Sequence, residues 1–257
     1  MEALIELLNL KISPNQVYKK VSIVIPVYNE KRTIRAVIDI VSGAPVLGLE
    51  KEIVLVDDCS KDGTREILQE YKERQQIAGA ILNIIFHEKN TGKGGALHTG
   101  FAHASGDIIL VQDADLEYDP HEYEILLKPF LHDKADVVYG SRYLQNSLRQ
   151  VQRFWHTFFN KLFTFFSNML TNVYFTDVQT CYKAFNRKVL DQVALKLESK
   201  RFGFEPEFTA RIAKKKYKIV EVPISYYPRG YGMGKHIGLL DALEGLWVIV
   251  KYNIFRK

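Results

Sequence analysis

The chain has 257 residues, 47% of them hydrophobic, which suffices for one large α/β domain and excludes a chain that is disordered by composition. Its formal net charge of +5 favours an anionic substrate or a membrane surface, whereas the basic residues are scattered and form no recognised nucleic-acid motif, so nucleic acid is not expected as a partner. Two cysteines, Cys59 and Cys181, lie far apart without metal-ligand spacing, as is usual in a reducing, cytoplasmic setting.

The N-terminal residues 1–12 are apolar but include Glu2 and Glu6, and they lack the basic start of a signal peptide. This pattern predicts a short amphipathic helix. No stretch of the sequence reaches the roughly 18 uninterrupted apolar residues of a membrane span. We therefore expect a protein that is soluble or bound to a membrane surface.

The first half of the chain alternates strand and helix patterns. Short β-branched or apolar runs predict strands at residues 21–27, 52–56, 81–86 and 107–111. Helical spacing predicts helices at residues 30–41, 62–77 and 94–104. This alternation is typical of a doubly wound, mostly parallel α/β sheet, in which ligands bind outside the carboxyl ends of the strands.

The second half is harder to assign. Residues 136–140 read as a strand, and residues 154–175 carry aromatic side chains at helical spacing with polar residues between them. Residues 237–252 repeat this pattern more weakly. The aromatic face either packs on the sheet or lies in a membrane interface, where aromatic and basic side chains are favoured.

Two carboxylates follow the strand at residues 107–111, in the motif Asp113-Ala114-Asp115. Alternate residues of an extended chain point the same way, so the two side chains can converge. Converging carboxylate oxygens suit Mg²⁺ or Mn²⁺ bound to a diphosphate. Taken alone, the motif also fits an acidic turn after a buried strand.

Polar residues after the other strands provide a nucleotide site. Tyr28 can stack on a base, Glu30 can reach a hydroxyl, and Asp57 can accept a hydrogen bond from a base imide. We interpret Asp58 and Asp62 as turn and helix-cap residues. The glycine loop at residues 92–95 lets the backbone approach a ligand, and its Lys93 can meet phosphate charge.

The motifs together resemble glycosyltransferase family 2 of the GT-A fold. In the first half the matching segments are Ile25-Pro26-Val27-Tyr28-Asn29-Glu30, residues 56–64, residues 90–97 and Asp113-Ala114-Asp115. In the second half they are Gly140-Ser141-Arg142-Tyr143, residues 177–183, residues 201–207 and residues 221–227. These later segments are similar to those of polyprenyl-phosphate hexose synthases, the relatives of dolichyl-phosphate mannose and glucose synthases.

This resemblance implies a single GT-A domain over residues 1–257, with a Rossmann-like, mostly parallel sheet flanked by helices and amphipathic interface helices near the C-terminus. Residues 20–140 would form the nucleotide-sugar half, and residues 141–257 the acceptor and membrane half. The implied reaction moves a hexose from GDP-mannose or UDP-glucose to a polyprenyl phosphate with Mg²⁺ or Mn²⁺. The implied location is the cytoplasmic face of a membrane, with a membrane-anchoring partner protein as one arrangement.

Residue roles follow from the same resemblance. The implied nucleotide-sugar ligands are Pro26, Tyr28, Glu30, Asp57, Lys93, Asp113, Ala114, Asp115, Arg229 and Lys235. The implied metal ligands are Asp113, Asp115 and Glu117. Ser141 and Arg142 would hold the acceptor phosphate, together with either Arg149 or Arg153. The implied catalytic residues are Asp113, Asp115, Arg142 and Arg229.

A phosphate acceptor is already ionised near neutral pH, so it needs positioning by arginine and no general base. We therefore expect direct displacement with inversion and no side-chain nucleophile, and we expect the histidines to be structural. The alternative is a family 2 enzyme acting on a glycan hydroxyl, for which Glu205 or Glu207 would have to be the base. A sugar-nucleotide pyrophosphorylase is disfavoured because its glycine-rich loop is absent after residues 21–27, and the acidic motif argues against a binding module without catalysis.

Overall fold

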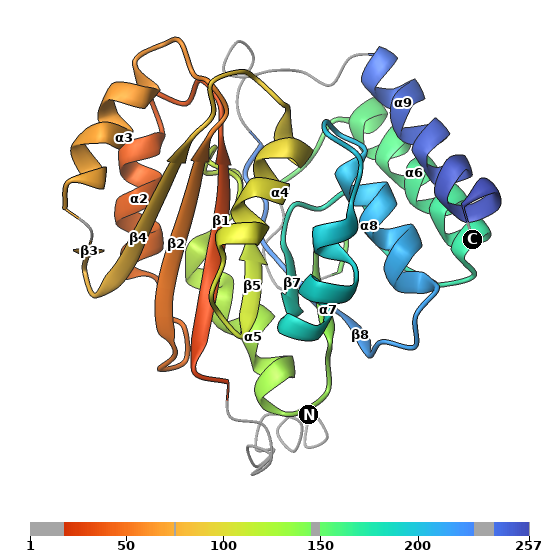
Figure 1. Ribbon diagram of the computed structural model, residues 1–257. Helices are drawn as coiled ribbons and strands as arrows, with labels where there is room; N and C mark the ends of the chain where they lie inside the picture. Colours follow the sequence, from red (N-terminus) through yellow and green to blue (C-terminus); the bar gives the residue numbers. More distant parts are fainter. Residues whose placement is uncertain (1–17, 75, 145–149, 229–238, 257) are drawn as a thin grey trace.

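The computed structural model describes residues 18–74, 76–144, 150–228 and 239–256, which form an α/β fold around one mostly parallel sheet flanked by helices (Figure 1). The strands are β1 (Lys20–Val27), β2 (Glu50–Asp57), β3 (Gln76–Ile77), β4 (Ala80–Phe86), β5 (Ile108–Val111), β6 (Val137–Ser141), β7 (Lys183–Asn186) and β8 (Ile219–Pro223). The sheet order is β3-β4-β2-β1-β5-β7-β6-β8. The predicted fold class is confirmed.

The helices are α2 (Ile34–Gly43), α3 (Thr64–Lys72), α4 (Lys93–His103), α5 (Tyr123–Leu131), α6 (Phe154–Thr171), α7 (Arg187–Gln192), α8 (Phe204–Ala213) and α9 (Leu239–Val250). Short 3-10 turns lie at Pro120–Glu122 and Ala194–Lys196, and a π-helical turn at Lys251–Phe255 follows α9. The predicted helix at residues 1–12 lies outside the described residues.

The middle residues of the central strands β1, β2 and β5 are almost all buried, as the continuous apolar runs predict. β1 pairs in parallel with β2 and with β5, and β2 pairs in parallel with β4. Residues such as Ile23, Val54 and Leu110 have no exposed surface. Parallel strands covered on both faces need apolar side chains on both, which explains why these runs lack alternation. Their carboxyl ends therefore meet at one edge of the sheet.

Two predicted helices are shorter in the structure. The helix expected at residues 30–41 begins at Ile34, because the Glu30 carbonyl accepts hydrogen bonds from Thr33 N and Ile34 N in a preceding turn. The helix expected at residues 62–77 ends at Lys72. Its last residues instead form β3, which turns back onto β4 through Ala78 and Gly79, both with positive φ. The turn geometry thus overrides the helical spacing there.

β7 was not predicted from the sequence, and it connects the two halves. It lies antiparallel between β5 and β6, and β6 pairs in parallel with β8. A strand that begins only at residue 183 thus lies beside β5, the strand that the acidic motif follows. The second half continues the same sheet.

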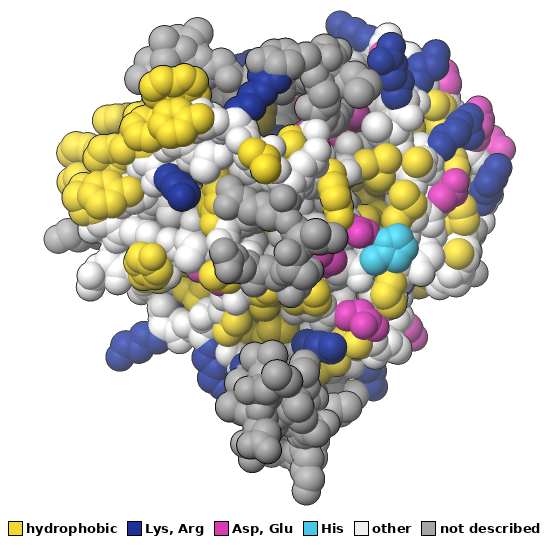
Figure 2. All heavy atoms as spheres, turned by 180° about the vertical axis from the view of Figure 1, so that it is seen from behind, with side chains coloured by type: hydrophobic (Ala, Val, Ile, Leu, Met, Phe, Trp, Pro, Cys, Tyr) yellow, Lys and Arg dark blue, Asp and Glu magenta, His cyan; other side chains and the backbone are white. Residues whose placement is uncertain are grey.

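Helix α6 buries only two residues, and both are polar. Its buried residues are Thr164 and Ser167. Its exposed large side chains are Phe154, Trp155, Phe158, Phe159, Phe165 and Met169. This exposed part of the aromatic face does not pack on the sheet, whereas Leu162, Phe163, Phe166 and Leu170 are half-buried. The helix packs against α8 and α9 instead, and hydrophobic side chains gather over this side of the molecule (Figure 2).

Candidate active site

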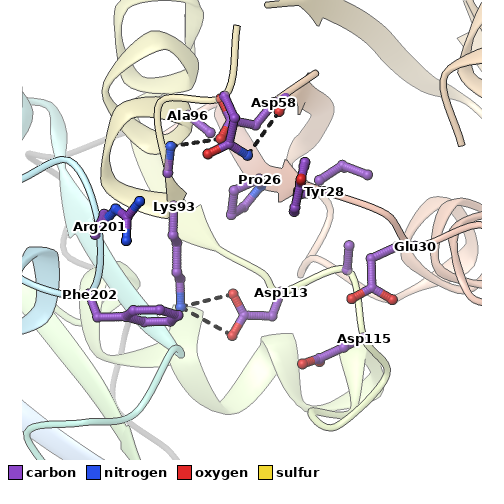
Figure 3. A pocket seen from close by; sticks show the side chains of 14 residues that line it. Pro26, Tyr28, Glu30, Asp58, Lys93, Ala96, Asp113, Asp115, Arg201 and Phe202 are labelled. Atoms are coloured by element: carbon purple, nitrogen blue, oxygen red, sulfur yellow. Dashed lines mark hydrogen bonds and ion pairs between the residues drawn. The ribbon is translucent and has the colours of Figure 1, made fainter. Parts of the chain in front are cut away.

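A cavity of about 400 Å³ opens at the carboxyl edge of β1, β2 and β5 (Figure 3). Its lining consists of Pro26, Val27, Tyr28, Glu30, Asp58, Asn90, Gly92, Lys93, Ala96, Asp113, Ala114, Asp115, Arg201 and Phe202. The predicted nucleotide-sugar residues that the structure brings together here are Pro26, Tyr28, Glu30, Lys93, Asp113, Ala114 and Asp115. The cavity lies where ligands bind in open α/β sheets.

The acidic motif is held in place by Gln112, the residue after β5. The backbone N–H of Gln112 donates to Val24 O, and its Nε2 donates to Asp113 O. Its Oε1 accepts hydrogen bonds from the buried hydroxyls of Tyr123 and Tyr182. Because Gln112 is itself buried, its hydrogen bonds restrain the backbone that carries the two carboxylates.

Lys93, at the start of α4, contacts two carboxylates from different halves of the chain. Its Nζ lies 3.0 Å from Asp113 Oδ1, 3.2 Å from Asp113 Oδ2 and 2.9 Å from Glu205 Oε1. Burial lowers the pKa of Lys93, but the charges of Asp113 and Glu205 outweigh it, so this pKa lies well above its usual value. The ammonium is therefore charged, and its positive charge lies directly beside the acidic motif.

Asp58 has a different place from the one predicted. Instead of capping a helix, it lines the cavity and holds the glycine loop. Its carboxylate accepts hydrogen bonds from Thr91 N and Gly92 N at 2.8 and 2.7 Å, and it contacts His87 Nδ1 at 2.8 Å. Asp62 does accept a hydrogen bond from Thr64 N at the start of α3.

Asp57, predicted to face the base, is fully buried, and the cavity lining described here does not include it. Its carboxylate accepts hydrogen bonds from Arg65 Nε at 2.8 Å and from Ser60 N at 3.2 Å. These contacts account for the side chain as part of the turn after β2.

The glycine loop fits against the segment that precedes α8. Gly95 N donates to Lys200 O at 3.0 Å, and a Cβ at Gly92 would lie 2.5 Å from the same oxygen. At Gly94 a Cβ would collide with Ser199 O. The backbone approach thus explains the glycines. It also brings Arg201 and Phe202 into the lining, although the sequence motif that contains them indicated no role for either.

The cavity offers Asp113 and Asp115 as metal donors, without Glu117. The Glu117 carboxylate accepts a hydrogen bond from Tyr226 OH at 2.8 Å, and the described part of the cavity lining does not include it. Among the described residues, no three His, Cys, Asp or Glu side chains gather as a metal site. Two carboxylates fit a cation such as Mg²⁺ that takes further ligands from substrate phosphates and water.

The predicted acceptor residues lie outside this cavity. Arg142 is buried and makes a bidentate ion pair with Asp177, with Nε–Oδ2 at 2.7 Å and Nη2–Oδ1 at 2.8 Å. Burial lowers the pKa of Arg142, but Asp177 outweighs it and keeps the group charged. Ser141 Oγ lies 2.6 Å from Thr176 Oγ1 and accepts from Tyr143 N.

The first turn of α6 lies beside Arg142. His156, in that turn, has its pKa lowered by burial and by the charges of Arg142 and Arg153, although Glu117 opposes this. The Lys161 ammonium lies 5.6 Å from the centre of the Tyr143 ring. Arg142, Arg153 and Lys161 thus place positive charge on the N-terminal half of α6 and next to it. Of the other predicted basic residues, Arg149, Arg229 and Lys235 lie outside the described residues.

The two candidate bases of the glycan alternative are both engaged. Glu207 is fully buried and accepts hydrogen bonds from Ser199 N and from Arg211 Nε at 2.8 and 2.7 Å, which is a structural role. Glu205 is almost fully buried and pairs with Lys93. Neither carboxylate has the open position that a general base needs.

Comparison with known proteins places the chain in a family. The model of glycosyl transferase family 2 matches residues 22–194. The chain is 29% identical to a dolichol-phosphate mannosyltransferase of Pyrococcus furiosus over 91% of its own length and 64% of that protein. It is also 29% identical to a UDP-N-acetylglucosamine–dolichyl-phosphate N-acetylglucosaminyltransferase of Methanococcus voltae, over 93% of the chain and 94% of that protein.

Among solved structures, the fold is similar to glucosyl-3-phosphoglycerate synthase of Mycobacterium tuberculosis in complex with Mn²⁺, UDP and phosphoglyceric acid. The TM-score is 0.69 at 18% identity, covering 92% of this chain and 79% of that one. This likeness supports the GT-A fold, and the matched family model covers more than half of the chain. The protein therefore belongs to glycosyl transferase family 2.

Proposed function

We propose that the protein transfers a hexose from a nucleotide sugar, GDP-mannose or UDP-glucose, to a polyprenyl phosphate at a membrane surface. The observation that carries this proposal is the cavity that joins Asp113, Asp115 and Lys93 at the carboxyl edge of the sheet. In one place the cavity supplies two carboxylates that can bind a metal ion and an ammonium group that can bind a phosphate. A nucleoside diphosphate is the ligand that uses both.

On the donor side, Tyr28 is 43% exposed at the cavity wall and can stack on the base, while Glu30 can reach the ribose. Asp113 and Asp115 would hold Mg²⁺ or Mn²⁺. When bound, the metal would neutralise charge on the departing diphosphate. Arg201 adds positive charge to the same wall, and backbone contacts at Gly92 and Gly95 fix the loop from which Lys93 projects.

On the acceptor side, a phosphate monoester is already an anion near neutral pH, so its oxygen can attack the sugar carbon directly. Arg142 would orient it, with Ser141 and Arg153 near the same end of α6. Asp177 aligns the Arg142 guanidinium through two hydrogen bonds. A single displacement inverts the sugar configuration and requires no side-chain nucleophile.

The membrane part of the proposal rests on α6. Phe154 and Trp155 at its first turn are 70% and 66% exposed, and the basic residues Arg153 and Lys161 lie near them in the sequence. Aromatic and basic side chains together favour a lipid interface. No helix among the described residues has the length and apolarity needed to cross a bilayer. The cytoplasmic face and an anchoring partner protein remain predictions.

The test is transfer by purified protein with GDP-mannose, UDP-glucose or UDP-N-acetylglucosamine as the donor. The acceptor is a short polyprenyl phosphate, the matching polyprenol, or an oligosaccharide. We expect a sugar-phosphate lipid only with the phosphate acceptor, and only with Mg²⁺ or Mn²⁺ present. Product from the oligosaccharide alone would replace the lipid proposal by the glycan alternative.

A second arm of this test uses Arg142→Lys, which keeps the charge but loses the bidentate fork. We expect the kcat/KM for the polyprenyl phosphate to fall by about 10–100-fold, since an arginine–phosphate pair is charge-assisted and geometrically specific. Donor affinity, measured by calorimetry with the nucleoside diphosphate, should stay within about twofold. A loss confined to donor binding would move Arg142 to the donor side.

A further inference from the structure

We infer that Lys93 is a built-in competitor for the divalent metal: its ammonium occupies both oxygens of Asp113, and metal binding requires that Lys93 release this carboxylate. The inference rests on the proposed function, because it concerns the same metal site. It adds an exchange step that neither the family nor the acidic motif implies. Lys93 would thereby weaken metal binding until a diphosphate offers the ammonium another anion.

The first support is the geometry of the contact. Lys93 Nζ lies 3.0 and 3.2 Å from the two Asp113 oxygens, so it bridges the carboxylate as a chelated cation would (Figure 3). Asp113 is the first carboxylate of the acidic motif. An ammonium in this position repels a divalent cation and occupies the lone pairs that would bind it.

The second support is the restraint on Lys93. Its Nζ also lies 2.9 Å from Glu205 Oε1, and the exposed fractions of the Lys93 and Glu205 side chains are only 18% and 6%. Partial burial strengthens the interaction compared with a surface ion pair, which would be screened by water and salt. The ammonium is thus held in the site by a second carboxylate that is not part of the acidic motif.

The third support is the charge that remains when Lys93 is removed. Asp113 and Glu205 both contact the same nitrogen, so they lie close together and share one neutralising cation. Lys183 is also buried nearby, but its Nζ donates to the carbonyl groups of Val178 and Thr180. Without Lys93, the two carboxylates form a stronger cation site than the wild type has.

The first experiment measures Mn²⁺ affinity by calorimetry in the absence of nucleotide, at constant ionic strength, for wild type and Lys93→Met. We expect the variant to bind Mn²⁺ about tenfold more tightly or better, because a competing charge is gone. Lys89→Met removes an exposed lysine four residues away and should change the affinity by less than about twofold.

A double variant locates the gained binding. Lys93→Met with Asp113→Asn should lose the tighter Mn²⁺ binding, since the amide no longer offers a charged pair of oxygens. Equal Mn²⁺ affinity in Lys93→Met and wild type would overturn the inference. So would an equal gain in Lys89→Met, which would show an effect of net charge alone.

A second measurement needs only the wild-type protein, so it stands even if Lys93→Met does not fold. An amine-acetylating reagent labels lysines, and mass spectrometry follows the Lys93 and Lys89 peptides with and without Mn²⁺. We expect Mn²⁺ to raise the labelling rate of Lys93 several-fold and to leave Lys89 unchanged. A Lys93 rate that does not respond to saturating Mn²⁺ would contradict the exchange.

The two proposals fail differently. If the wild type binds no Mn²⁺ even with GDP or UDP present, and transfer proceeds in EDTA, the metal-dependent function and the exchange both fall. If transfer needs the metal but Lys93→Met binds it no more tightly, only the exchange is wrong.

Discussion

In β1, β2 and β5 the apolar side chains are almost all buried, whereas in α6 six large apolar side chains are exposed and the two buried residues, Thr164 and Ser167, are polar. Both segments have a clear hydrophobic pattern. The pattern of a strand covered on both faces leaves no choice of side, since every residue is inside. The pattern of an amphipathic helix leaves two choices, and only the neighbouring elements decide which face is buried.

The largest effect is expected at Asp115, which follows the buried strand β5. Asp115→Ala should reduce kcat by about 10²–10³-fold, because it removes a charge that acts where charge develops on the leaving diphosphate. The melting temperature should change little, since Asp115 lies at the cavity wall. Asp133→Asn is the control: Asp133 is 55% exposed and pairs with Lys218 far from the cavity. Full transfer by Asp115→Ala would remove it from the metal site.

The second test concerns the exposed aromatic side chains of α6. Replacing both Phe158 and Phe159 by Ser should release the protein from anionic liposomes in a flotation assay, while its melting curve stays close to that of wild type. The reason is that these rings are 44% and 55% exposed, so their removal leaves no cavity. Phe101→Ser is the matched control. Phe101 is buried against Phe185, and its loss should cost about 3–5 kcal/mol of unfolding free energy.

Wild-type protein that never floats with liposomes would count against the membrane interpretation of α6. A double variant that unfolds would show that the two rings are part of a packed interface.

A third test concerns the contact between the halves. Gly94→Ala should destabilise the protein by about 1–3 kcal/mol, because the new Cβ meets the Ser199 backbone oxygen, which cannot move freely. Gly43→Ala is the control, since nothing lies within 4 Å of the place its new Cβ would take, and it should be neutral or slightly stabilising. Denaturant curves measure both. An equal effect would show that the glycine loop does not depend on this approach.

The last test is a pH dependence of stability that comes from Lys183. Burial lowers its pKa from 10.5 to about 8, so the unfolded chain holds this proton more tightly than the folded one. Protonation therefore favours unfolding, and the contribution of Lys183 to stability should rise as the pH increases from about 8 to 10.5. Denaturant curves across this window should show that the unfolding free energy of wild type rises with pH relative to that of Lys183→Met. A constant difference would place Lys183 in a more polar environment.

Local chemistry explains what sequence alone could predict. The buried parallel strands and the convergence of Tyr28, Glu30, Lys93 and the acidic motif follow from strand ends meeting at one edge. The sequence assigned Asp57 to the base and Asp58 to a turn or helix cap, but which way each of two adjacent carboxylates turns is decided by contacts that the local sequence does not encode. Asp57 turns toward Arg65, and Asp58 toward the loop at Thr91.

Long-range contacts account for the rest. The resemblance implies that Glu117 is a metal ligand, and only the structure shows that Tyr226, more than a hundred positions later, donates a hydrogen bond to its carboxylate. Arg201 and Phe202 reach the cavity only because their segment rests on the glycine loop. β7 was missed because its four residues carry no alternation and depend on β5 and β6 for pairing. No local pattern encodes such partners.

The contact of Lys200 O with Gly95 N affects where the chain can be cut to make fragments or chimaeras. The region that matches the family ends at residue 194, yet this carbonyl, and the Glu205 carboxylate that holds Lys93, come after it. A fragment cut at that border would lack one wall of the cavity that contains the acidic motif. Chimaeras that exchange acceptor specificity between relatives should therefore carry residues 199–205 together with the glycine loop, so that both sides of the joint come from the same parent.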